Sequence, residues 1–200
     1  GGEIIPKITG EEVSKRPQDA VRPSFPTLCP DCGSPLVKDE SEARHYCTNE
    51  ACPTRVKGAF LHFISRKAMN INAGDATIDQ LYDKGYIKEL PDLYRLDMEK
   101  LLTLDGWKER SAQNFLDSIA ASVRVPFSRV LFALGIRHVG ETTARTLTAR
   151  MRSIEAMEKA SKEDFLEVED IGEVIADSLV DYFADSGHRR IIEELRGFGL

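Results

Sequence analysis

Four short turns recur in this sequence at intervals of 34, 32 and 32 residues, and this repeat constrains the fold more than any other feature. Each turn follows a short apolar stretch and leads into a segment with a small or apolar residue four positions on. The residues at the equivalent position of the four turns are Gly74, Lys108, Gly140 and Gly172. Units that recur in this way bury their apolar faces by stacking on their neighbours. The sequence therefore predicts a mainly α fold, with a domain of four helix–hairpin–helix repeats over residues 55–200.

The hairpins themselves are predicted near residues 72–74, 106–108, 138–140 and 170–172. A tight turn favours glycine, because glycine adopts backbone conformations that other residues resist. Lys108 stands where the other repeats have glycine, so we expect it either to strain its turn or to add a cation there. The middle residue of each hairpin is apolar and is expected to pack between the helices, and these residues are Ala73, Trp107, Val139 and Ile171. Stacking on a base is the alternative role for Trp107.

The second helix of each repeat begins directly after its hairpin, which leaves its first N–H groups and the positive end of its dipole free. Such a helix start binds phosphate without a basic side chain. The alternative is a helical repeat that only packs, but four hairpins in register favour nucleic acid. The residues of the repeats that we expect to contact DNA are Gly74, Gly106, Lys108, Arg110, Gly140, Thr142, Thr143, Arg145 and Gly172. The fourth hairpin lies among acidic residues, so a purely structural role is open to it.

The formal net charge of −6 argues against a nucleic-acid partner, but the charges are unevenly distributed. Residues 124–152 carry six basic residues and one acidic residue, whereas residues 153–200 carry five and thirteen. Local fields, and not the net charge, govern contact with phosphate. Residues 55–70 form a second basic stretch without any acidic residue. This stretch is either a solvated face or a phosphate contact through Lys57, Arg66 and Lys67.

All four cysteines of the chain fall in one pattern, Cys29-x2-Cys32-x14-Cys47-x4-Cys52. Two pairs of thiolates at this spacing suit the tetrahedral coordination of zinc. Gly33, directly after the first pair, can adopt the positive φ that such a turn requires. We interpret residues 29–54 as a small four-cysteine zinc finger whose metal is structural, since four protein ligands leave no open position. Two disulfides or four buried free thiols are the alternatives, and His45 is either a surface residue or a substitute ligand.

Residues 11–28 are rich in proline, which fixes φ and removes backbone donors, so we expect an extended linker there. The clustering of the cysteines argues against a secreted disulfide scaffold and for a reducing cytoplasm. No apolar run reaches the roughly 18 residues of a membrane span, and the N-terminus has no signal-peptide core. These features predict a cytoplasmic protein that does not associate with a membrane.

A four-cysteine zinc finger followed by four helix–hairpin–helix repeats resembles the C-terminal half of the bacterial NAD-dependent DNA ligases. Local stretches add to the resemblance, namely GEIIPK at 2–7, FISRKAM at 63–69, DLYRL at 92–96 and LGIRHVG at 134–140. The first of these resembles the end of the family's OB domain, so residues 1–10 are expected to be the remainder of that domain. Two hairpin positions, Asn72 and Lys108, depart from the family's preference for glycine.

The resemblance implies an enzyme that seals nicks in duplex DNA during replication and repair. It also implies NAD and Mg²⁺ as cofactors of the parent enzyme, and a nucleophilic lysine in a K-x-D-G motif. That motif does not occur in this sequence, because Lys7-Ile8-Thr9-Gly10 lacks the aspartate. This chain is therefore expected to contain no catalytic residue, to bind neither cofactor, and to grip the DNA backbone without sequence specificity.

The partners that the resemblance implies are nicked duplex DNA and the adenylation and OB domains of the same parent chain. Those domains would precede these residues, and the family's BRCT domain would follow them. The chain is expected to be a monomer at the bacterial nucleoid. Two other interpretations stay open, namely a stand-alone nucleic-acid-binding adaptor and a protein-interaction module in which the repeats only pack.

Overall fold

Helices make up nearly all of the regular structure in the part of the chain that the structure describes, which confirms the predicted mainly α fold. The computed structural model describes residues 7, 9–22, 24–38 and 44–200. The chain divides into two compact units, residues 1–48 and 49–200. Most of the expected OB remainder at residues 1–10 lies outside the described residues. Within the described ranges, no helix combines the length and the apolar character that crossing a membrane requires.

The first unit contains a short two-stranded sheet. Strands β1 (Leu36–Lys38) and β2 (His45–Cys47) pair antiparallel, in the register Leu36–Cys47, Val37–Tyr46 and Lys38–His45. A separate antiparallel bridge joins Leu28 to Pro35, the residue directly before β1. A single turn of 3-10 helix, η1 (Val13–Lys15), lies in the proline-rich segment. Strands of three residues bury little apolar surface, so this unit needs another source of stability.

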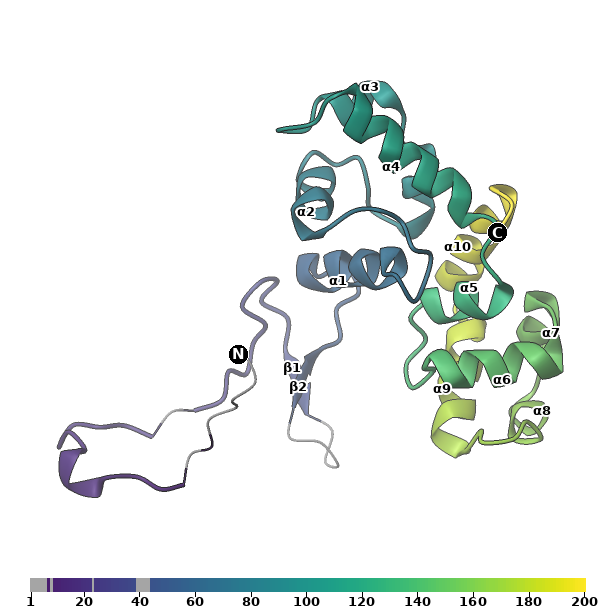
Figure 1. The fold of residues 1–200 in the computed structure, drawn as a ribbon. Coiled ribbons are helices and arrows are strands. Elements are labelled where there is room, and N and C mark those ends of the chain that lie inside the picture. Colours follow the sequence, from purple (N-terminus) through teal and green to yellow (C-terminus); the bar gives the residue numbers. More distant parts are fainter. Residues whose placement is uncertain (1–6, 8, 23, 39–43) are drawn as a thin grey trace. The chain divides into compact units, whose positions relative to one another are not determined.

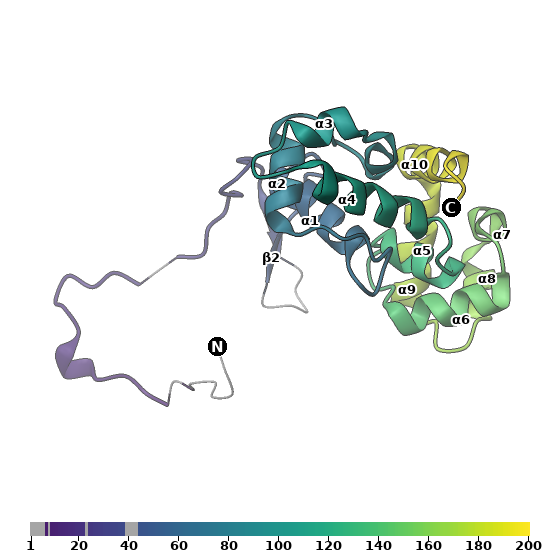
Figure 2. The ribbon, with the colours of Figure 1, turned by 45° about the horizontal axis from the view of Figure 1, so that its top comes forward.

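Each of the four predicted turns in the second unit lies between two helices (Figure 1). Hairpin 1 joins α1 (Pro53–Ile64) to α2 (Asp75–Asp83), hairpin 2 joins α3 (Met98–Leu102) to α4 (Glu109–Ser122), hairpin 3 joins α5 (Phe127–Ala133) to α6 (Glu141–Met151), and hairpin 4 joins α8 (Lys162–Leu166) to α9 (Glu173–Ala184). The remaining elements are η2 (Leu90–Arg95), α7 (Ile154–Lys159) and α10 (Ser186–Gly197). Helices α1–α4 group on one side of this unit and α5–α9 on the other (Figures 1 and 2).

Hairpins 2, 3 and 4 share one turn geometry. A hydrogen bond between backbone groups three residues apart closes each turn, from Trp107 N to Leu104 O at 3.2 Å, from Val139 N to Ile136 O at 3.0 Å, and from Ile171 N to Val168 O at 3.2 Å. The residue before the donor is left-handed in all three, with φ of 79° at Gly106, 64° at His138 and 63° at Asp170. Hairpin 1 is longer, and its left-handed residue is Asn70 at φ 55°. The left-handed position thus lies three residues before the first residue of the second helix in hairpins 2 to 4.

The glycines at the starts of the second helices do not serve the turn, which corrects one of our expectations. Gly74, Gly140 and Gly172 have φ of −122°, −84° and −95°, and Lys108 at the same position has φ of −133°. Any residue adopts these extended conformations, so Lys108 does not strain its hairpin. A Cβ atom added at any of the three glycines would meet nothing within 4 Å. Folding alone therefore does not require glycine at these three positions.

The middle residues of the hairpins pack against the helices, as the sequence predicts. Val139 and Ile171 are buried, and Ala73 and Trp107 pack half-buried against the same core. The Trp107 ring meets the ring of Phe115 edge-on at a centroid distance of 5.4 Å, so its role is in the core. The largest fully buried side chains of this core include Phe60, Phe63, Phe115, Leu131, Leu147 and Phe165.

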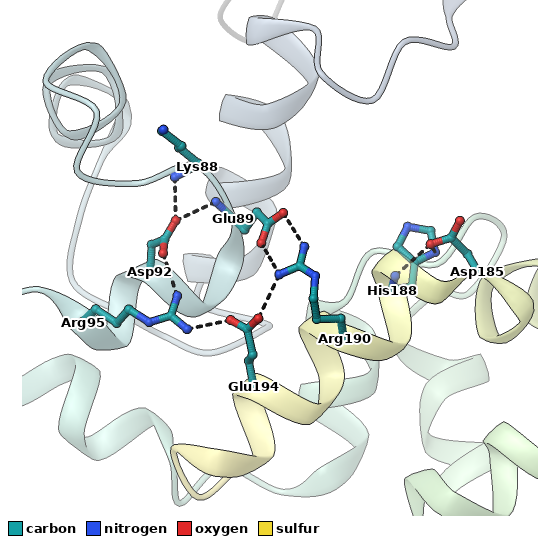
Figure 3. A network of polar contacts seen from close by, with 8 residues as sticks. All are labelled: Lys88, Glu89, Asp92, Arg95, Asp185, His188, Arg190 and Glu194. Atoms are coloured by element: carbon teal, nitrogen blue, oxygen red, sulfur yellow. Dashed lines mark hydrogen bonds and ion pairs between the residues drawn. The ribbon is translucent and has the colours of Figure 1, made fainter.

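A network of ion pairs fastens α10 to the segment around η2 (Figure 3). The Arg190 guanidinium donates to both carboxylate oxygens of Glu89, at 2.8 and 2.6 Å, and to Glu194 at 2.8 Å. Glu194 also accepts from Arg95 at 2.6 Å. Burial opposes ionisation of Asp92, but two backbone N–H groups and Arg95 outweigh that effect and lower the pKa of Asp92. The network fixes where the last helix lies against the first half of the unit.

We predict opposite stability effects for one substitution at two glycines. Gly106→Ser places a side chain at φ 79°, and the free energy of unfolding should fall by about 1–2 kcal/mol. Gly140→Ser leaves the backbone unstrained and supplies a cap to α6, so the free energy of unfolding should rise by a few tenths of a kcal/mol. Urea unfolding of the zinc-loaded variants, followed by circular dichroism at the helical band, measures both. Equal losses in the two variants would contradict the assignment of the left-handed position.

Candidate metal centre and nucleic-acid interface

The four cysteines converge. Their Sγ atoms all lie within 4.8 Å of one another, and those of Cys32 and Cys47 are 3.5 Å apart. Zinc–sulfur bonds of about 2.3 Å in a tetrahedron place the sulfurs about 3.8 Å apart, so this arrangement fits zinc. Cys29 and Cys52 are buried and the other two are half-buried. None of the four forms a disulfide, so the paired-disulfide alternative finds no support.

Local backbone geometry aims these thiols at one point. The Gly33 N–H donates to the Cys29 carbonyl at 2.9 Å, and Gly33 takes the predicted positive φ of 69°. Cys47 ends β2, and Cys52 caps the N-terminus of α1, where the positive end of the helix dipole favours a thiolate. His45 is not part of the group and stacks on Phe25 at 5.1 Å between ring centroids. Four sulfur donors complete a tetrahedron, so a zinc ion held here would shape the chain and would have no open position for a reactant.

The second helices of hairpins 1, 3 and 4 begin without a side-chain cap. Helices α2, α6 and α9 start after exposed Gly74, Gly140 and Gly172, and no side chain accepts a hydrogen bond from their first turns. Four other helices of the unit do have such a cap. In each, the side chain of the cap residue accepts a hydrogen bond from a backbone N–H of the first turn. The pairs are Asp97 with Lys100, Ser153 with Ala156, Ser161 with Asp164 and Asp185 with His188. The first N–H groups of α2, α6 and α9 are therefore open to an external acceptor.

Hairpin 2 differs, because a side chain satisfies the N–H of Lys108, the residue that precedes its second helix. The Ser111 hydroxyl oxygen accepts from the Lys108 N–H at 2.9 Å and donates to the Lys108 carbonyl at 2.8 Å. The Lys108 and Arg110 side chains are exposed and make no ion pair within the described residues. Gly106 serves the left-handed turn. Hairpin 2 thus places two exposed cations beside a helix whose first-turn N–H groups also lack a side-chain cap.

At hairpin 3, predicted DNA-contacting residues of hairpins 1 and 3 lie close together. Glu141, the first residue of α6, pairs with Arg145 one turn on and with Lys67 of hairpin 1 at 3.7 Å. Thr142 is exposed and Thr143 is half-buried beside them. Arg129 of α5 holds the two hairpins together, because its guanidinium donates to three consecutive backbone carbonyls, those of Arg66 at 2.6 Å, Lys67 at 3.2 Å and Ala68 at 2.7 Å. Sequence reasoning assigned Arg129 no role, and no local signal connects residues 61 positions apart.

The Lys57 side chain forms ion pairs with α2 of the same helical unit. Its ammonium group lies 2.9 Å from Asp79 and 3.2 Å from Asp83, both on α2. The hydrogen bond to Asp79 is the main cause of a raised pKa for Lys57. The same group lies 5.1 Å from the centre of the Tyr82 ring. Lys57 therefore stands apart from the cations grouped at hairpins 1 and 3.

Hairpin 4 has the opposite electrostatic character. Lys162 of α8 lies 2.5 Å from Glu173 and 2.7 Å from Asp177, both on α9. Two carboxylates surround one cation there, so the start of α9 carries a negative balance. Its open N–H groups favour an anion while its side chains repel one.

Two family models match the chain. The model described as "NAD-dependent DNA ligase C4 zinc finger domain" matches residues 29–53, which contain the cysteine cluster. The model described as "Helix-hairpin-helix motif" matches residues 129–192, which contain hairpins 3 and 4.

Curated relatives named DNA ligase match the chain over its whole length. A DNA ligase of Parabacteroides distasonis is 52% identical, one of Bacteroides fragilis is 46% identical, and one of Koribacter versatilis is 41% identical. In each case the match covers 100% of this chain and 30% of the relative, so the chain spans about a third of the length of these proteins. The chain is thus similar, over its whole length, to one region of bacterial proteins named DNA ligase, and its cysteine region matches the C4 zinc finger of the NAD-dependent DNA ligases.

Proposed function

We propose that this chain is the DNA-holding part of a ligase that seals nicks in duplex DNA, and that it binds the backbone without sequence specificity. The observation that carries the proposal is the uncapped start of α6 beside exposed cations, in a chain whose relatives are named DNA ligase. A phosphate oxygen is the acceptor that such N–H groups favour, because it also satisfies the helix dipole. Contacts to phosphate fix a protein on the duplex but read no bases.

The proposed contacts fall into three groups. Hairpins 1 and 3 form the main one, through the amides after Gly74 and Gly140 and the side chains of Arg66, Lys67, Thr142, Thr143 and Arg145. Hairpin 2 adds the cations Lys108 and Arg110, with Gly106 shaping its turn. Gly172 of hairpin 4 contributes least, because of its acidic surroundings. Lys57 is omitted, since α2 already pairs with it.

We further propose that Cys29, Cys32, Cys47 and Cys52 hold one structural zinc ion, within a finger over residues 29–54. The chain has no K-x-D-G motif, so adenylation of a lysine, and with it the binding of NAD and Mg²⁺, belongs to other domains of the parent enzyme. Residues 1–10 and 11–28 would then be the end of the OB domain and a linker. A monomer engaged on chromosomal DNA in the bacterial cytoplasm fits this role.

We predict that Cys47→Ser abolishes stoichiometric zinc while the helical unit stays folded. One of four thiolates is lost, but residues 49–200 keep a hydrophobic core of their own. Elemental analysis should fall from one zinc per chain, and the helical circular dichroism should change little. His45→Ala is the matched control and should keep its zinc. Full zinc content in Cys47→Ser, or zinc loss in His45→Ala, would contradict the ligand set.

Binding to duplex DNA should fall steeply with salt and depend little on sequence. Two to five phosphate contacts predict a slope of log K against log salt of about −2 to −5. Fluorescence anisotropy with nicked and intact duplexes of two unrelated sequences measures the slope and any preference for the nick. An absence of binding at about 50 mM salt would oppose the proposal and favour a protein-interaction module.

Gly140→Ser should weaken DNA binding although it stabilises the fold. The serine oxygen would accept from the first turn of α6 and compete with phosphate for the same N–H groups. We expect the Kd for nicked duplex to rise about tenfold. Gly172→Ser, at the same position of acidic hairpin 4, is the matched control and should change the Kd by less than about twofold. Similar Kd values for both variants and the unmodified chain would remove the start of α6 from the interface.

A further inference from the structure

We propose that Glu141 restrains the DNA affinity of this chain, by holding two cations of the interface, Lys67 and Arg145, in ion pairs at the start of α6. The inference rests on the proposed DNA-binding function and assigns one residue of that site the opposite effect to its neighbours. Glu141 pairs with Arg145 and lies 3.7 Å from the Lys67 ammonium. A phosphate that reaches these cations must therefore displace a carboxylate.

The fold brings Lys67 to Glu141 by a specific contact. Lys67 lies in the turn after α1, and Glu141 follows 74 positions later in the sequence. Arg129 fixes this turn beside hairpin 3 through its bonds to the carbonyls of Arg66, Lys67 and Ala68. Arg129 itself belongs to α5, the first helix of hairpin 3. The Lys67–Glu141 pair is thus held by backbone anchoring on one side and by the helix start on the other.

The exposure of the three side chains allows the exchange. Lys67 and Arg145 are 76% and 68% exposed, whereas Glu141 is 35% exposed. Within the described residues, Glu141 is the acidic partner of both cations. An incoming phosphate can approach them from solvent, but part of their charge is already neutralised. Removing the carboxylate would leave both cations with only small counterions to release.

The equivalent acidic residues of the other hairpins serve as controls for Glu141. The first residue of each second helix is acidic, and these residues are Asp75, Glu109, Glu141 and Glu173. Glu109 makes no ion pair within the described part of the chain. Glu173 shares Lys162 with Asp177, so its removal leaves that cation paired. Only at Glu141 does one carboxylate among the described residues hold two exposed cations at a hairpin.

A restraint of this kind suits an enzyme that works on successive nicks. Release of product limits the turnover of many enzymes, and a sealed duplex keeps all the phosphates that the chain holds. A carboxylate that returns to the cations as phosphate leaves would favour release. Removal of the Glu141 carboxylate would then strengthen DNA binding and slow the release of the sealed duplex.

Glu141→Gln tests the proposal with the zinc-loaded chain of 200 residues and a labelled nicked duplex. The amide keeps the size of the side chain and removes its charge. We expect the Kd to fall about two- to tenfold, from the release of two surface ion pairs. The slope of log K against log salt should steepen by up to about 2. Glu109→Gln and Glu173→Gln make the same change in net charge and should alter the Kd by less than about twofold.

A chain that lacks both cations distinguishes two possible effects of Glu141. The first is that Glu141 pairs with Lys67 and Arg145, and the second is that its charge simply repels phosphate. In a K67A/R145A chain, Glu141→Gln should no longer tighten binding. An undiminished gain in that background would overturn the proposal, as would equal Kd values for Glu141→Gln and the unmodified chain when both bind. Binding by neither chain at low salt would instead contradict the proposed function itself, and the inference with it. Thermal unfolding of each variant confirms that it is folded.

Discussion

Backbone N–H groups at the starts of helices are the constraint on which the rest of this structure depends. Every α-helix leaves its first N–H groups without an intrahelical partner, so another acceptor has to be found. Helices α3, α7, α8 and α10 find it in the side chain of their own cap residue. Helices α2, α6 and α9 begin at exposed glycines that offer no such acceptor. This contrast distinguishes helices that are capped within the chain from helices whose first N–H groups we propose to bind phosphate.

Ion pairing within the chain explains how an acidic protein could carry the proposed phosphate-binding surface. Lys57 is paired with both Asp79 and Asp83, so we leave it out of the proposed surface, although it lies in the most basic stretch of the first half. Arg66, Lys108 and Arg110 make no ion pair in the described residues. Net charge therefore underestimates the capacity of this chain for phosphate, and a count of basic residues along the sequence overestimates it. Whether a cation is available to phosphate depends on its ion-pair partner, and tertiary structure determines that partner.

The features that could be predicted from the sequence are those that depend on residues close together in the chain or on its repeating pattern. The positive φ of Gly33, the convergence of the cysteines and the helix on either side of each hairpin depend on separations of a few residues or on one repeating pattern. Of the two alternatives for Lys108, strain in its turn is wrong, because the aligned glycines mark the helix start and the left-handed residue lies two positions before Lys108. The contacts of Lys57 with Asp79 and of Arg129 with Ala68 join residues far apart, and no local pattern encodes them.

The two units differ in how much apolar surface they bury, and this difference bears on the role of the proposed zinc ion. Residues 49–200 bury a continuous apolar core, whereas Val37 and Phe25 of the first unit are largely exposed. A segment with so little burial would depend on bonds from the proposed zinc to the thiolates, and its folding would then be coupled to zinc binding. Cys52 belongs to the cysteine cluster and is also the cap residue of α1. The proposed zinc would therefore fix the start of the helix that leads into hairpin 1, and so support DNA binding without touching DNA.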